Sequence, residues 1–164
     1  MDPAGRLVSE DRSASSAYGI AILAGLAAAV VGGIAWGLIV RWTDYEIGFA
    51  AWGIGFLAGA AVLTATRGRR GLPFQAIAVI SALLGIAIGK YLSFAWILDD
   101  APELEVSVFS SDTVDLFFDE LSLVFDWIDL LWVGLAVYTA WRALQPQEPE
   151  PEQVETPSEP ERTP

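Results

Sequence analysis

Five of the ionisable side chains that lie inside or between the long apolar runs form a candidate cluster, and charges at such depths are rare and usually have a role. They are Arg41, Glu46, Lys90, Asp126 and Asp129. Such a charge cluster could form ion pairs, relay protons or conduct ions. The 164-residue chain contains neither histidine nor cysteine, so the usual general base, a thiolate nucleophile and the commonest metal ligands are missing. We therefore predict no catalytic residue, no metal site and no cofactor.

The heights of these residues along their predicted helices indicate which charges could meet. Lys90 lies about 25 Å above Pro73, which is near the start of its helix, at ~1.5 Å per residue. Counted back from Trp141, an interface-type residue, Asp126 and Asp129 lie about 22 and 18 Å up the last helix. Three interpretations of Lys90 stay open. Its ammonium reaches up to the lipid head groups, or pairs with Asp126 or Asp129, or belongs to a transport path or catalytic site.

The stretch 43–46 has the spacing of a helix-capping box. In this interpretation Thr43 caps the start of the second helix, and the Glu46 carboxylate reaches back to the Thr43 N–H. Such a cap satisfies backbone donors that are costly to leave bare at a membrane helix end. Arg41, just before it, could cap the carbonyl end of the first helix or meet a lipid phosphate. We predict that this stretch is the turn of a helical hairpin.

Four apolar segments must position these side chains, and each has the ~20 residues needed to cross a bilayer. The sequence is 54% hydrophobic with a mean hydropathy of +0.46, yet its formal net charge is −12. This pattern predicts an all-α, polytopic membrane protein whose four transmembrane helices form a compact bundle. The predicted spans are residues 17–41, 45–66, 72–98 and 123–144, with a polar lead over 1–16, an outer acidic segment over 99–122 and a disordered Pro/Glu tail over 145–164.

The distribution of basic residues predicts that both termini are cytoplasmic. With the N-terminus inside, most arginines fall on the cytoplasmic side, and only Arg41 and Lys90 fall outside, which puts the charge cluster in the outer leaflet. The link between the third and fourth spans is acidic. From residue 112 its apolar side chains recur at helical spacing opposite carboxylates. We expect an amphipathic acidic helix on the outer surface, with Ser111 or Asp112 as its N-cap.

The first three spans each carry a row of small residues four apart, which lets helix backbones approach closely in lipid. The last span has only Ala136 and Ala140 at this spacing, so we expect it to pack more peripherally. The rows are compatible with the folding of one chain and equally with a homodimer seam. The predicted packing residues are Gly33 and Gly37 in the first span, Gly55 and Gly59 in the second, and Ser81, Gly85 and Gly89 in the third.

Three blocks of the sequence resemble a loose group of small bacterial four-helix membrane proteins. The blocks are RWTDYEIGFAAWGIGFLAGAAV, GIAIGKYLSF and DLLWVGLAVYTAWRAL. The shared features are a hairpin with a YEIG-like re-entry, a GKYL-like end of the third helix and a DLLW…TAW-like last helix. The resemblance implies this architecture in the bacterial plasma membrane and no established activity. It places Glu46, Lys90 and Asp129 inside the shared blocks, and most of the acidic outer helix and the tail outside them.

These features support one main functional hypothesis. It is a non-enzymatic structural, accessory or interaction protein of the bacterial plasma membrane, with the lipid bilayer and a second copy or another membrane protein as partners, and no nucleic acid. The alternative is a small ion- or proton-coupled transporter or channel component that uses the Lys/Asp cluster. An intramembrane enzyme has no nucleophile–base pair in the sequence to support it.

Overall fold

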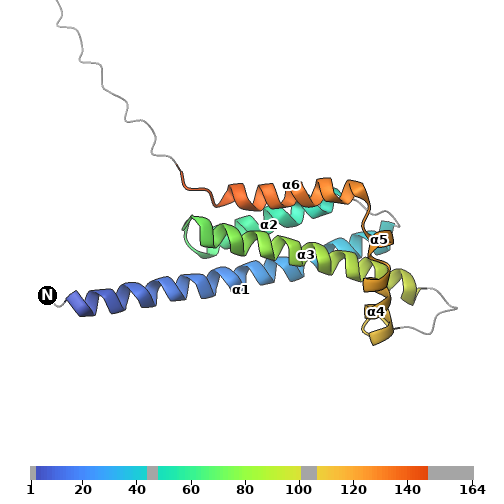
Figure 1. Ribbon diagram of the computed structural model, residues 1–164, viewed down its shortest axis with the longest axis horizontal. Coiled ribbons are helices and arrows are strands. Elements are labelled where there is room, and N and C mark those ends of the chain that lie inside the picture. Colours follow the sequence, from blue (N-terminus) through green and yellow to red (C-terminus); the bar gives the residue numbers. More distant parts are fainter. Residues whose placement is uncertain (1–2, 44–47, 101–106, 148–164) are drawn as a thin grey trace, which may run out of the picture.

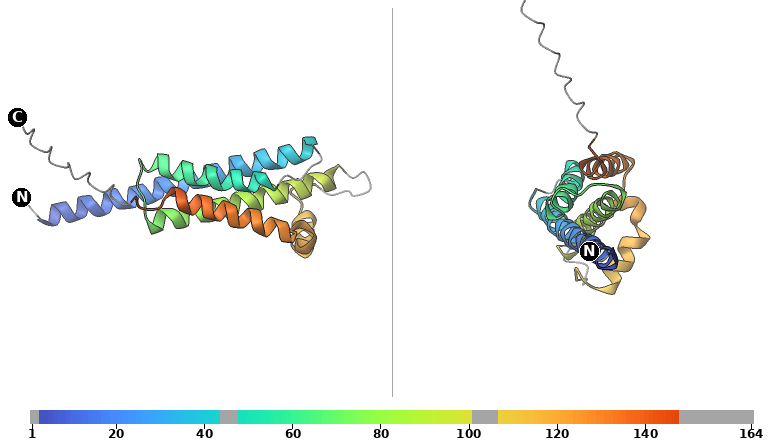
Figure 2. Two further views of the ribbon diagram at one scale, coloured as in Figure 1. Left: turned by 90° about the horizontal axis from the view of Figure 1, so that it is seen from above. Right: turned by 90° about the vertical axis from the view of Figure 1, so that its left-hand side faces the viewer.

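The computed structural model describes residues 3–43, 48–100 and 107–147, and every regular element in these ranges is a helix (Figure 1). The prediction of an all-α fold is confirmed. Four long helices lie side by side, and two short ones cross one end of the bundle, here called the α4 end (Figure 2). The helices are α1 (Pro3–Thr43), α2 (Phe49–Ala65), α3 (Leu72–Asp99), α4 (Ser111–Asp119), α5 (Leu121–Val124) and α6 (Trp127–Ala143).

The observed bounds differ from the predicted spans at three helix starts. Helix α1 begins at Pro3, so most of the predicted polar lead is helical; proline is favoured at a first helical position, where its missing N–H costs nothing. Helix α2 begins at Phe49 and α6 at Trp127, each four residues later than predicted. Most of the predicted tail, residues 148–164, lies outside the described residues.

Thr43 lies at the C-terminal end of the first helix, before the described start of the second. It is the last residue of α1, and its Oγ1 donates to the Ile39 carbonyl at 2.7 Å. This back-bonding to the preceding turn competes with capping. Helix α2 has Gly48 as its N-cap, without a side-chain cap bond. The predicted capping box of Thr43 and Glu46 stays a prediction, because Glu46 lies outside the described residues.

The rows of small residues form two seams inside the chain. In the first seam, α1 meets α3: a Cβ on Gly33 would lie 2.8 Å from the Gly85 carbonyl oxygen, and one on Gly37 2.9 Å from the Leu92 Cβ. Gly89 completes this seam, since a Cβ there would lie 2.6 Å from the Trp36 ring. Ser81 is also buried on this side of α3. Close approach without Cβ atoms is what these positions require.

In the second seam, α2 meets α6. A Cβ on Gly59 would lie 2.9 Å from the Ala143 Cβ, and one on Gly55 would collide with the Ala136 backbone. Ala136 and Ala140 are fully buried. The expectation that the last helix packs more peripherally is confirmed, because α6 packs against α2 and α3 and, among its described residues, buries Asp129, Ala136 and Ala140 alone.

At the end opposite α4, the last turn of α6 is tied to the α2–α3 link. The Arg70 guanidinium donates to the carbonyls of Ala143 at 2.8 Å and Gln145 at 3.2 Å. The Gly71 N–H donates to the Leu144 carbonyl at 3.0 Å. The final carbonyls of a helix lack partners within it, and a cation there also complements the helix dipole. This link therefore fixes the end of α6.

Helix α4 is held against α3 by aromatic contacts. The Phe117 ring lies 5.3 Å from that of Tyr91 and 5.7 Å from that of Phe94, both edge-on. The Tyr91 hydroxyl donates to the Val108 carbonyl at 2.6 Å. The N-cap of α4 is Ser110, so the prediction of Ser111 or Asp112 is wrong by one or two residues. The predicted amphipathic helix thus exists, but it ends at Asp119 and is not continuous with α6.

The outer surface of the long helices is apolar. Two of them, over Ser15–Thr43 and Leu72–Asp99, are long and apolar enough to cross a membrane, while Phe49–Ala65 is a shorter apolar helix. Large apolar side chains are exposed on all four long helices: Leu23, Val31, Phe56, Ile80, Ile97, Leu130, Leu131 and Tyr138 are each more than half exposed.

Candidate functional site

Lys90, the single lysine of the sequence, forms a buried ion pair with Asp129. Its Nζ lies 2.7 Å from Asp129 Oδ2, and the side chains are only 2% and 12% exposed. Lys90 belongs to α3 and Asp129 to the first turn of α6, so the pair joins two helices that are distant in sequence. Of the three interpretations left open for Lys90, this geometry excludes an ammonium that reaches the surface.

A break in the chain between α5 and α6 creates the second partner of Lys90. Helix α5 ends at Val124, and Phe125 has an extended backbone. The Val124 carbonyl is therefore not followed by a helical turn whose N–H could donate to it. The Lys90 ammonium donates to this carbonyl at 2.8 Å. One cation thus binds the end of α5 and the start of α6, and it holds the break in place.

Asp126 and Asp129 form a capping box at the N-terminus of α6. Asp126 is the N-cap, and its carboxylate accepts the Trp127 N–H at 2.6 Å. In return, Asp129 Oδ2 accepts the Asp126 N–H at 2.9 Å. The negative charge of Asp129 is also stabilised by the positive end of the α6 dipole. The exposed Asp126 acts as the N-cap, whereas the buried Asp129 also forms the ion pair with Lys90.

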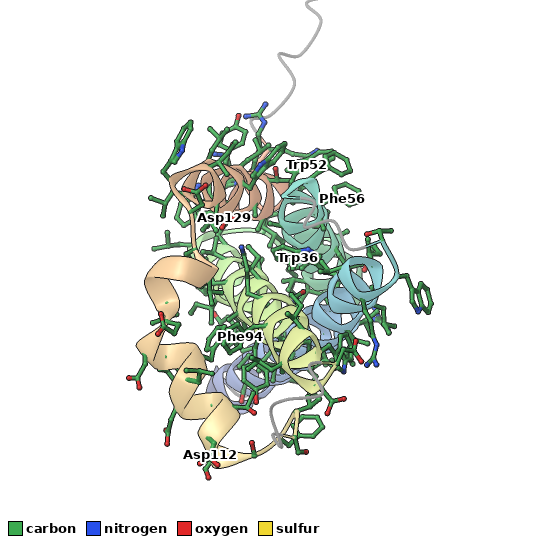
Figure 3. All side chains as sticks on the ribbon, turned by 90° about the vertical axis from the view of Figure 1, so that its right-hand side faces the viewer. Trp36, Trp52, Phe56, Phe94, Asp112 and Asp129 are labelled. Atoms are coloured by element: carbon green, nitrogen blue, oxygen red, sulfur yellow. The ribbon has the colours of Figure 1, made fainter. Side chains whose placement is uncertain are left out.

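Aromatic rings enclose the ammonium. The Lys90 Nζ lies 5.2 Å from the Phe125 ring centre and 5.9 Å from that of Trp36, both within cation–π range. Seen from the α4 end, Trp36 lies in the interior and Asp129 on the side of α6 that faces α3 (Figure 3). Among the described residues, Trp36 Nε1 is a buried side-chain nitrogen without a hydrogen-bond partner. The pair therefore lies in a largely apolar enclosure.

Arg41 forms a second, separate ion pair at the same end of the bundle. Its Nη2 lies 3.1 Å from Asp100 Oδ1, and the side chains are 37% and 59% exposed. The guanidinium also lies over the Trp96 ring, 5.5 Å from its centre. The predicted cluster is thus divided: Lys90 and Asp129 meet in the interior, while Arg41 pairs with a residue that the sequence did not single out.

The contacts of the Lys90–Asp129 pair fit a structural role, in which the ion pair holds two helix ends together. The ammonium donates to a carboxylate and a carbonyl, and Asp129 Oδ2 accepts from Lys90 and from a backbone N–H. In the described part of the chain, no group of three or more Asp or Glu side chains could hold a metal ion. Sequence reasoning missed Val124, Phe125 and Trp36, and only the Asp-x-x-Asp spacing before α6 could have indicated the break.

No protein-family model, curated protein or solved structure matches this chain. The resemblance to small bacterial membrane proteins therefore stays a prediction, and the inference of function starts from the geometry.

Proposed function

We propose that the protein is a non-enzymatic, multi-pass protein of the bacterial plasma membrane that acts as a structural, accessory or interaction partner. In this proposal α1, α2, α3 and α6 each cross the bilayer. Both termini are cytoplasmic, and the α4 end faces outward. The protein would act through its helix surfaces, its acidic α4 and its C-terminal tail.

The observation that carries the proposal is the exposed apolar surface of the helices that are too short to qualify as spans by themselves. Helix α6 presents Leu130 at 70% exposure and Leu131 at 63%, and α2 presents Phe56 at 61%. Soluble proteins rarely expose so many large apolar side chains together. At 17 residues each, α2 and α6 are about 26 Å long, near the lower limit for a span.

The surroundings of Lys90 support an interaction protein over a transporter. A transport site needs a charge that water or a cargo ion reaches, whereas Lys90 is 2% exposed and is bound by Asp129, the Val124 carbonyl and two aromatic faces. The mutual contacts of these charges offset part of the cost of removing them from water. The pair is thus better suited to fixing the helix break than to releasing an ion.

Single cysteines can test the four spans, because the sequence contains none. Trp42, Arg69, Ser107 and Gln147 are exposed positions in α1 or in the segments that join or follow the helices. With a membrane-impermeant maleimide on intact cells, we expect labelling at Trp42→Cys and Ser107→Cys. Arg69→Cys and Gln147→Cys should react only after permeabilisation. Labelling of Arg69→Cys on intact cells would contradict the proposal that α2 crosses the membrane. Labelling of Gln147→Cys on intact cells would contradict the same proposal for α6.

A transporter or channel component is the alternative. The observation in its favour is the buried Lys90–Asp129 pair, which the proposed placement puts at membrane depth. Purified protein in proteoliposomes distinguishes the two. The main proposal predicts no flux of H⁺, Na⁺ or K⁺ above that of empty liposomes. A flux that Lys90→Met abolishes would favour the alternative and overturn the main proposal.

A further inference from the structure

We propose that the Arg41–Asp100 pocket binds the head group of an aminophospholipid of the phosphatidylethanolamine type. The inference rests on the proposed membrane placement. The pocket has a volume of about 100 Å³ and lies between the last turns of α1 and α3. It is lined by Val40, Arg41, Ser93, Trp96, Ile97 and Asp100.

The pocket carries one charge of each sign at head-group height. Asp100 is the C-cap of α3, about 15 Å beyond Lys90 along the helix axis, so the pocket lies at the mouth of the bundle. An ethanolamine head group carries a phosphate anion and a primary ammonium a few atoms apart. Arg41 matches the phosphate and Asp100 the ammonium. Charge complementarity of this kind specifies the partner.

Arg41 keeps donors available for a phosphate. A guanidinium has five N–H groups, and within the described part of the chain Arg41 donates one of them, from Nη2, to Asp100. The guanidinium carbon lies over the Trp96 ring, and the planar fork of a guanidinium is a geometry that binds phosphate through pairs of hydrogen bonds. Since both side chains are well exposed, their own ion pair contributes little and can open to admit the head group.

The acidic side of the pocket selects against purely anionic lipids. Asp100 would repel a phosphate that brings no cation, and the exposed Asp99 beside it adds a second carboxylate. The apolar rim suits the lipid chains, because Ile97 is 64% exposed next to the charges. The Ser93 hydroxyl is already bound to the Gly89 carbonyl at 2.9 Å, so recognition falls to the two charged residues.

Native mass spectrometry of the full chain in detergent tests this assignment. Dioleoyl phosphatidylethanolamine should bind about tenfold more tightly than dioleoyl phosphatidylglycerol in such titrations. A tenfold difference in affinity corresponds to about the contribution of one charge-assisted hydrogen bond. Asp100→Asn should abolish this preference, and Arg41→Gln should weaken both lipids. Arg142→Gln, an exposed cation at the opposite end, is the matched control and should change neither.

Three results would overturn the inference. They are equal binding of the two lipids by the unmodified protein, unchanged binding after Arg41→Gln, and equally tight binding of soluble O-phosphoethanolamine, which would assign the pocket to a free zwitterion. Cysteine labelling reports the topology independently. Absence of the lipid preference in a protein with the four-span labelling pattern would therefore refute this inference alone.

Discussion

Removing one charge of the Lys90–Asp129 pair should destabilise the protein far more than removing both. Lys90→Met keeps the length of the side chain, but it leaves the Asp129 carboxylate and the Val124 carbonyl buried without their cation. Asp129→Asn leaves the ammonium without its anion, while the amide oxygen can still accept the Asp126 N–H. In the double variant, no uncompensated charge remains.

The structure sets the size of these effects. Breaking a buried pair by removing one partner costs about 3–5 kcal/mol, and Lys90 and Asp129 are, as whole residues, 2% and 8% exposed. The double variant loses chiefly the bond to the Val124 carbonyl, about 1–3 kcal/mol. The two single losses would sum to roughly 6–10 kcal/mol, so the expected coupling energy is at least about 3 kcal/mol.

Equilibrium unfolding in mixed detergent micelles, titrated with SDS and followed by tryptophan fluorescence, measures the three free energies. The matched control is Arg41→Met, which removes an exposed ion pair at the same end and should cost under about 1 kcal/mol. Single-variant losses that add to within about 0.5 kcal/mol in the double variant would refute the reasoning. So would a Lys90→Met loss no larger than that of the control.

Three further changes test the packing. Gly55→Ala should destabilise the protein by about 1–3 kcal/mol, because the new Cβ would collide with the α6 backbone. The control Gly53→Ala places its Cβ in open space and should be neutral or stabilising, so an equal effect of the two variants would contradict the α2–α6 seam. Trp52→Phe should cost about 0.5–1.5 kcal/mol by removing the 2.9 Å bond from Trp52 Nε1 to Thr139 Oγ1, and Thr139→Val in that background should add little, as measured in the same SDS titration. Phe117→Ala should release α4 from α3 and speed proteolysis around residue 110 severalfold in limited digestion, with the rate at the α2–α3 link unchanged as the internal reference.

The sequence predicted the helical class and the residues of the seams, because small residues four apart have few other uses in apolar helices. It could not predict which rows meet. Gly85 and Gly33 face each other only because the links place α3 beside α1, and nothing within either helix specifies that neighbour. For the same reason the Arg41–Asp100 pair, 59 residues apart, has no local signal.

The candidate site was predicted in part. Heights counted along straight helices placed Lys90 level with Asp126 and left Asp129 one turn deeper. The structure pairs Lys90 with Asp129 because the chain breaks at Phe125, and the cap then takes Asp126. A capping box that the sequence analysis did not predict occurs before α6, where aspartates fill both positions. A break within an acidic amphipathic stretch depends on tertiary contacts with α3, which local periodicity does not report.

The central claim is that the bundle encloses Lys90 without a water path, and the reactivity of this lysine in the membrane tests it most directly. Lys90 is the only lysine of the sequence, so a water-soluble amine-reactive ester followed by peptide mass spectrometry reports it without any substitution. The variant Ser107→Lys, at an exposed position, supplies the positive control. We predict that the introduced side chain of that variant is modified while Lys90 stays unmodified over the same time. Modification of Lys90 at a comparable rate would contradict the account and indicate a water-filled path to the ion pair.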